Sequence, residues 1–88
     1  MGVIYKYPIN VVDSQMLVMP EGYKIIKADF QNQVLTIWAI VNPVNKLLDV
    51  KIRVIETGHT IFCDGELNHI GTVQEYNLVW HVFEEEEI

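Results

Sequence analysis

The sequence predicts an all-β fold, a small antiparallel β-sandwich or barrel of about six or seven strands. Most stretches between turn signals are short and rich in β-branched and aromatic residues, and Val34–Val41 is the clearest example. No comparable stretch has the apolar spacing and the capping residues of an amphipathic helix. Turn signals recur every 8 to 12 residues or so, roughly the interval seen in sandwiches and small barrels.

The composition is that of one domain with its own core. The chain has 88 residues, of which 50% are hydrophobic, so a core can form without disulfides, but two separate cores do not fit. We predict one all-β domain over residues 1–83 and an acidic C-terminal tail over residues 84–88. Small domains bury a modest share of their surface, so we also expect a homo-oligomer.

The net charge of −6 is concentrated at the end of the chain, in Glu84 to Glu87. The remainder is nearly neutral, which argues against non-specific nucleic-acid binding and against attraction to an anionic membrane. The single cysteine, Cys63, predicts a reducing compartment. Because there is also no signal-peptide pattern and no apolar run long enough to cross a bilayer, we expect a cytoplasmic protein.

The first half of the chain reads as two strands and a hairpin. Val3–Ile9 and Gln15–Met19 are the two strands, and Pro20-Glu21-Gly22 closes the second. Next, Tyr23–Phe30 and Gln33–Asn42 flank the dipeptide Gln31-Asn32, in which Asn tolerates the positive φ of a tight turn.

The hairpin register sets the two faces. With Gln31-Asn32 as the loop, Phe30 lies opposite Gln33 and Ile26 opposite Ile37. The predicted core face is Ile26, Ala28, Leu35, Ile37, Ala39 and Val41. The other face carries Tyr23, Ile25, Trp38 and Ile40. Those four residues are too apolar for a solvated face, so a second sheet, a loop or a partner must cover them.

The second half predicts further strands. Asp49–Ile55 alternates apolar and polar side chains, Ile61–Phe62 is short, and His69–Tyr76 and Leu78–Phe83 follow. We interpret the acidic run after Phe83 as a solvated segment that guards an aggregation-prone strand, with a binding tail as the alternative.

The best candidate for ligand binding combines a strand with the turn after it. Arg53 is the only arginine, and Lys51 shares its face, so the pair suits a phosphate or a carboxylate. Thr57, Gly58 and His59 follow at the strand end, where binding loops tend to lie. The simpler alternative is that the cations form an ordinary polar strand face and that Gly58 marks a bulge or turn.

Candidate catalytic and metal residues do not form a known motif, so we predict no catalytic residue, no metal and no cofactor. His59 and Cys63 are four positions apart, too far to converge on a straight strand. His81 alternates with apolar residues and reads as a core histidine that is hydrogen-bonded to a neighbour. No Lys or Arg adjoins Cys63, so a reactive thiol is not supported.

Tyr5 and Tyr7 share one side of the first strand. Exposed, they would make an aromatic patch for stacking on a base or anchoring an interface. Buried, they would fill the core. We include both with Tyr23, Ile25, Trp38 and Ile40 as candidate interface residues.

Several blocks together resemble a family of uncharacterised proteins of about this length from bacteriophages and prophages. They are Ile4-Tyr5-Lys6-Tyr7-Pro8, Met19-Pro20-Glu21-Gly22, Leu35 to Val41, Thr57-Gly58-His59-Thr60-Ile61, Ile70 to Gln74 and Val79 to Glu84. Members more usually carry Gly after the turn Asn, where this chain has Gln33. The resemblance implies a phage accessory protein in the bacterial host cytoplasm, and it implies no site residues.

Three hypotheses follow from these observations. The first is a non-enzymatic binding protein that inhibits a host anti-phage defence component by stoichiometric contact. The second is a sponge that sequesters a nucleotide-derived immune signal, with Lys51, Arg53, Gly58 and His59 holding phosphate or ribose. The third is a small nucleotide hydrolase that uses His59 or His81.

Overall fold

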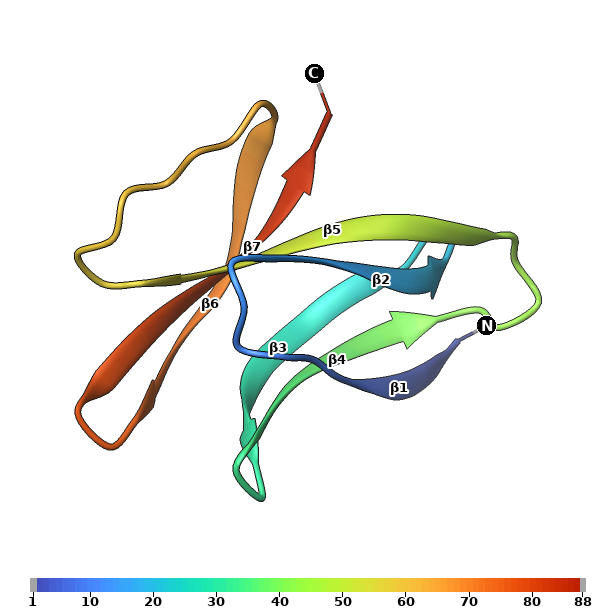
Figure 1. Ribbon diagram of the computed structural model, residues 1–88. Coiled ribbons are helices and arrows are strands. Elements are labelled where there is room, and N and C mark those ends of the chain that lie inside the picture. The colour runs from blue at the N-terminus through green and yellow to red at the C-terminus, as the bar shows by residue number, and fades with distance from the viewer. Residues whose placement is uncertain (1, 88) are drawn as a thin grey trace.

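The computed structural model describes residues 2–87 and confirms an all-β fold of seven antiparallel strands. The strands are β1 (Val3–Pro8), β2 (Ser14–Pro20), β3 (Lys24–Gln31), β4 (Val34–Val41), β5 (Leu47–Glu56), β6 (Glu66–Glu75) and β7 (Leu78–Glu86). They form a three-stranded sheet in the order β1-β4-β3 and a four-stranded sheet in the order β2-β5-β7-β6 (Figure 1). The two sheets make a sandwich that is not closed into a barrel.

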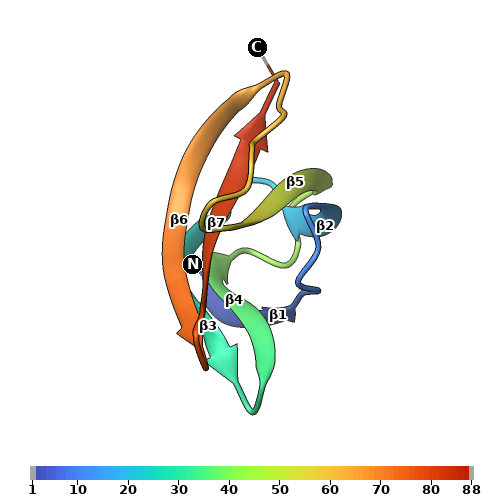
Figure 2. The same cartoon turned by 60° about the vertical axis from the view of Figure 1, so that its left-hand side comes forward.

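The sheets pack face to face over one core. β3 lies along β6, so the sheets approach each other on that side (Figure 2). On the other side β1 and β2 are the edge strands. The alternating side chains of each strand explain the core, because every second residue faces inward. The buried core residues of the two sheets include Met19, Leu35, Ile37, Ala39, Val41, Val50, Ile52, Val54, Val73 and Val82.

The β3–β4 turn lies one residue later than the sequence predicts. Its loop is Asn32-Gln33, both with positive φ (50° and 68°), and Gln31 pairs with Val34. Two successive residues in the left-handed conformation match the right-handed twist of a hairpin, which favours a turn at Asn32-Gln33 over one at Gln31-Asn32. Phe30 therefore lies opposite Leu35, and Ala28 opposite Ile37. The predicted pairings Phe30–Gln33 and Ile26–Ile37 are wrong.

The changed turn keeps the predicted faces, but a register shift between Ile25 and Lys27 reverses them for the start of β3. One extra residue in a strand reverses the side on which the preceding side chains point. Ile26, predicted in the core, is 46% exposed, while Ile25 pairs with Ala39 and packs against the core. Tyr23 also packs against the core. The other predicted core residues of this hairpin are confirmed, and they are Ala28, Leu35, Ile37, Ala39 and Val41.

The C-terminal acids do not begin a separate tail. β7 continues through Glu86, so Glu84 and Glu85 are strand residues, and Glu85 is buried. β7 pairs with β5 and β6 through Glu85, and Arg53 pairs with the Glu85 carboxylate, which offsets the cost of burying its charge. Ile61–Phe62, predicted as a short strand, lies in the long loop between β5 and β6 (Figure 1).

Candidate functional site

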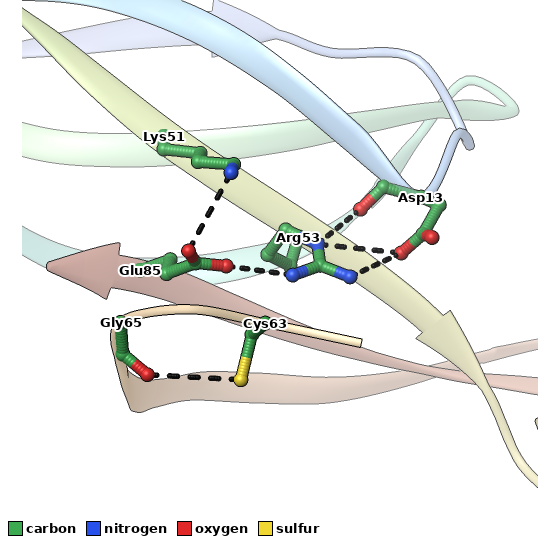
Figure 3. Close-up of polar contacts among 6 residues, drawn as sticks. All are labelled: Asp13, Lys51, Arg53, Cys63, Gly65 and Glu85. Carbon is green, nitrogen blue, oxygen red and sulfur yellow. Dashed lines mark hydrogen bonds and ion pairs between the residues drawn. The ribbon is translucent and has the colours of Figure 1, made fainter. Parts of the chain in front are cut away.

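The outer face of the four-stranded sheet centres on Arg53. Val50, Ile52 and Val54 fill the core, so the alternate β5 residues Lys51 and Arg53 point away from it. Arg53 is nevertheless only 2% exposed. The reason is that Asp13, in the β1–β2 connection, and Glu85 on β7 lie on either side of its guanidinium group (Figure 3).

Every nitrogen of the Arg53 guanidinium group donates a hydrogen bond. Nη1 donates to Glu85 Oε1 over 2.6 Å, Nη2 to Asp13 Oδ1 over 2.8 Å, and Nε to the Asp13 carbonyl oxygen over 2.9 Å. Lys51 Nζ lies 3.5 Å from the second Glu85 oxygen. The hydrogen bond from Arg53 holds the pKa of Glu85 below its ordinary value, although burial acts in the opposite direction. We call Asp13, Lys51, Arg53 and Glu85 the Arg53 cluster.

The predicted ligand residues lie in two separate places. Thr57, Gly58 and His59 line a cavity of about 230 Å³ to which neither Lys51 nor Arg53 contributes. Lys51 instead lines a larger cavity of about 550 Å³ at the end of β7. Six carboxylates line that larger cavity, those of Asp49, Asp64, Glu84, Glu85, Glu86 and Glu87. The structure thus places the two cations away from the turn and beside negative charge.

The turn after β5 is built by local hydrogen bonds. Gly58 has a φ of +94°, a conformation that glycine adopts without strain. The His59 N–H donates to the Glu56 carbonyl oxygen over 3.1 Å, and the His59 ring lies 3.3 Å from the Glu56 carboxylate. Thr57, Gly58 and His59 are all exposed, as expected for a loop that contacts a ligand or solvent.

His81 is not the core residue that the sequence predicts. Val82 faces the core, so His81 points to the outer face of the four-stranded sheet and is only half-buried. The predicted hydrogen bond to a neighbour is present, and there are two: Nε2 lies 2.8 Å from Thr57 Oγ1 and Nδ1 lies 3.0 Å from Thr72 Oγ1. Thr72 was missed because only strand pairing, which no local pattern encodes, brings it opposite His81.

The outer face of the three-stranded sheet has a different character. The register places Trp38 between Lys6 and Lys27, and in the next row it places Ile40 between Ile4 and Lys24. The Lys27 ammonium lies 5.6 Å from the centre of the Trp38 ring, within the range of a cation–π contact. Lys6 Nζ donates to Gln31 Oε1 over 3.0 Å, so its side chain crosses β4. We call this surface, made of Ile4, Lys6, Lys24, Lys27, Trp38 and Ile40, the Trp38 face.

The Trp38 face exposes apolar area within a positively charged rim. Ile4 is 60% exposed and Ile40 is 39% exposed. Three lysines surround them, and Asp29, 3.7 Å from Lys27, is the one acid that pairs with this rim among the described residues. The chain as a whole carries −6, so this face is locally opposite in sign to the rest of the molecule.

The six candidate interface residues are divided between the inside and the outside. Tyr23 and Ile25 pack against the core, and the Tyr23 hydroxyl donates to Glu84 Oε2 over 2.5 Å. Tyr7 packs against the core as well, and burial, followed by the nearby Tyr5, raises the pKa of its hydroxyl. Tyr5 stays 44% exposed at the edge of the sandwich. The remaining two, Trp38 and Ile40, share one outer face.

Within residues 2–87, no group of three or more His, Cys, Asp or Glu side chains is arranged to hold a metal ion. Cys63 is exposed, and its thiol lies 3.6 Å from the Gly65 carbonyl oxygen, which accepts its hydrogen bond (Figure 3). The part of the chain that the structure describes contains no helix with the length and apolarity needed to cross a membrane.

Comparison with known families places the whole chain in one family. A family model described as a domain of unknown function, DUF7352, matches residues 1–88, and the protein belongs to this family. No curated protein and no solved structure gives a significant match. The family description supplies no activity, so any function has to be argued from the surface of the molecule.

Proposed function

We propose that the protein is a phage accessory protein that inhibits a host defence component by stoichiometric contact and without turnover. The phage setting is supported by the sequence resemblance described above. The contact surface is the Trp38 face, and the observation that supports it most is the placement of Trp38 between Lys6 and Lys27.

The chemistry of the Trp38 face fits a protein partner. Binding energy at protein interfaces concentrates in a few residues, among which Trp is strongly enriched, and a surrounding rim excludes water. Here Ile4 and Ile40 extend the apolar area around Trp38, and both are exposed. A partner that buries this area gains the hydrophobic contribution of side chains that the protein itself leaves in water.

The charge of the face determines the kind of partner. Lys6, Lys24 and Lys27 all lie on it, so an acidic surface with an apolar centre complements it. Complementary charges speed the encounter and select the partner. Two copies of this chain placed face to face would oppose lysines to lysines. The Trp38 face therefore favours a different, acidic protein over a second copy.

A nucleotide sponge or nucleotide hydrolase is less well supported. Either function needs free cations to hold phosphate, and the Arg53 guanidinium already donates to Asp13 and Glu85. Lys51 lies beside Glu85 in the acidic cavity, where a phosphate group would be repelled. Ligand binding by Lys51, Arg53, Thr57, Gly58 and His59 remains a prediction.

The test is capture from infected host cells followed by reconstitution with the purified partner. We expect Lys6→Glu/Lys27→Glu to lose a host protein that the wild type retains. Lys46→Glu, in the exposed loop before β5, should retain it. The activity of that host protein should fall in proportion to the amount of this protein that is bound to it. Inhibition should be complete at a fixed molar ratio of the two proteins. Unchanged capture by the double variant, or full activity of the bound host protein, contradicts the proposal.

A further inference from the structure

A chain of hydrogen bonds crosses the outer face of the four-stranded sheet, on elements separate from the Trp38 face. Thr57 Oγ1 lies 2.8 Å from His81 Nε2, and His81 Nδ1 lies 3.0 Å from Thr72 Oγ1. Thr72 Oγ1 in turn lies 3.0 Å from His69 Nε2. Both ring nitrogens of His81 are thus engaged, and the chain ends at the exposed His69.

Three strands hold this chain in place. Thr72 and His81 are direct partners in the β6–β7 ladder. Thr57 follows β5, and its N–H donates to the Val79 carbonyl oxygen over 3.0 Å, so the pairing of β5 with β7 extends one residue further. A register shift between His69 and Gly71 lets His69 reach Thr72 three residues away. The side chains therefore lie on paired strands or beside them, which limits their movement.

The direction of the chain determines what Thr57 can do. When Thr57 donates its hydroxyl proton to His81 Nε2, His81 donates Nδ1–H to Thr72, and Thr72 donates to His69 Nε2. In the reverse direction His81 Nε2–H donates to Thr57. The Thr57 hydroxyl proton can then be donated to the Val79 carbonyl oxygen, 3.4 Å away. That oxygen already accepts the Thr57 N–H. Only the first direction points the Thr57 hydroxyl proton at His81 Nε2, across the 2.8 Å contact, as a nucleophile and its base require.

A cavity opens in front of Thr57 and His81. Its volume is about 230 Å³. Its apolar lining comes from Ile55, Ile61 and Phe83, and Glu56 and His59 also contribute to it. A Cβ built on Gly58 would meet no atom within 4 Å apart from its chain neighbours, so the space beside Gly58 is open. The cavity suits a small, uncharged, mostly apolar group, and it does not require the cations of the Arg53 cluster.

We propose that Thr57 is a nucleophile that accepts acyl groups from small uncharged esters, with His81 as its general base. A hydroxyl within hydrogen-bond reach of a base that a third group orients is the arrangement that nucleophilic catalysis needs. Thr57 Oγ forms a bond to the ester carbonyl carbon as its proton passes to His81 Nε2. The carbon–oxygen bond to the leaving alcohol then breaks, and His81 returns the proton to that alcohol.

Water completes the cycle. A water molecule attacks the Thr57 acyl ester, gives one proton to His81 Nε2, and releases the carboxylic acid as that proton returns to Thr57 Oγ. Thr72 and His69 are positioning residues. Thr72 Oγ1 accepts a hydrogen bond from His81 Nδ1–H, which fixes the tautomer of His81, and the Thr72 hydroxyl donates to His69 Nε2 at the solvent side. This activity does not depend on the Trp38 face.

The experiment treats the purified protein with p-nitrophenyl acetate and locates the acetyl group by intact mass and peptide mapping. A Cys63→Ser background removes the exposed thiol as a competing site. We expect acetylation at Thr57 and release of p-nitrophenol. Thr57→Val should abolish the label there, and His81→Gln should slow labelling by about 100-fold, the lower range for a general base. The Thr60→Val variant, altered in the same loop, should be acetylated at Thr57 at the wild-type rate.

The positioning role of Thr72 needs a separate readout. Thr72→Val should slow labelling and displace its pH profile, while Thr72→Ser should restore both, because a serine hydroxyl replaces the lost partner of His81. A wild-type protein that neither takes an acetyl group at Thr57 nor releases p-nitrophenol faster than Thr57→Val, or that is acetylated only on lysines or the N-terminus, overturns the proposal. So does a His81→Gln variant that is folded by circular dichroism and labels Thr57 at the wild-type rate.

Discussion

The two outer sheet faces hold five of the six lysine and arginine residues and differ in how these side chains are used. On the four-stranded sheet, Arg53 is buried and donates to two acidic residues. On the three-stranded sheet, Lys6, Lys24 and Lys27 are exposed around Trp38. The two faces thus differ in exposure: acidic partners enclose the Arg53 guanidinium group, whereas the three lysines stay in contact with solvent.

The largest expected effect comes from removing the centre of the Arg53 cluster. Arg53→Met leaves Glu85 buried without its main partner, and an uncompensated buried charge destabilises a protein strongly. We expect the free energy of unfolding, measured by urea denaturation, to fall by more than in any other variant described here. The matched change Lys27→Met, on the exposed face, should alter it by less than about 1 kcal/mol. Equal losses would show that the two faces do not differ in this way.

Low pH should lower the free energy of unfolding through the same cluster. The pKa of Glu85 is lowered in the folded protein, so its ionised form stabilises the fold at every pH above the ordinary value for Glu. That stabilisation is lost as the pH falls through the lowered pKa, because the carboxyl group then binds a proton. We expect Glu85→Gln to flatten the acid side of a plot of unfolding free energy against pH. An unchanged slope would exclude Glu85 as the responsible group.

A smaller change tests the hairpin that builds the Trp38 face. Gln33 has a φ of 68°, a conformation that is strained for a residue with a Cβ. Gln33→Gly should therefore raise the free energy of unfolding by about 1 kcal/mol. Gln31→Gly, two residues earlier in β3, should lower it by roughly 0.5 to 1 kcal/mol. If Gln31→Gly stabilised the protein instead, the turn would lie at the position that the sequence predicts.

The smallest expected effect is that of the Trp38 face on self-association. We predict a homo-oligomer because the domain is small and exposes several apolar side chains. Lys6→Glu/Lys27→Glu should leave the mass unchanged in light scattering, since like charges keep two Trp38 faces apart. A monomeric mass at working concentration contradicts the prediction of an oligomer. A mass that changes in the double variant contradicts the argument from charge.

The sequence predicted the fold class because alternation and turn residues are local properties. Ala28, Leu35 and Ile37 were assigned to the core correctly, since they lie between the turn and the bulge, where β3 and β4 pair without interruption. Ile25 and Ile26 were assigned to the wrong faces because a bulge is one inserted residue that no composition signal marks. The acidic end was read as a tail because the partner of Glu85 is Arg53, 32 positions earlier.

The candidate sites were harder to predict because their residues come from different strands. Trp38 and Ile40 were found as an apolar excess on one strand, but their flanking lysines depend on the pairing of β4 with β1 and β3. Similarly, the sequence marked Thr57 and His81 as separate candidates. Their hydrogen bonds to each other and to Thr72 depend on the alignment of β5, β7 and β6. Strand order is a long-range property, and residue patterns do not encode it.

Titration calorimetry of the reconstituted host partner with Lys27→Ala and Lys51→Ala tests the central claim most directly. Both lysines lie on strands, one on the Trp38 face and one in the Arg53 cluster. We expect Lys27→Ala to weaken binding by about tenfold, equivalent to roughly 1.4 kcal/mol, and Lys51→Ala to leave the affinity unchanged. A loss of affinity in Lys51→Ala with none in Lys27→Ala would show that the partner binds the four-stranded sheet.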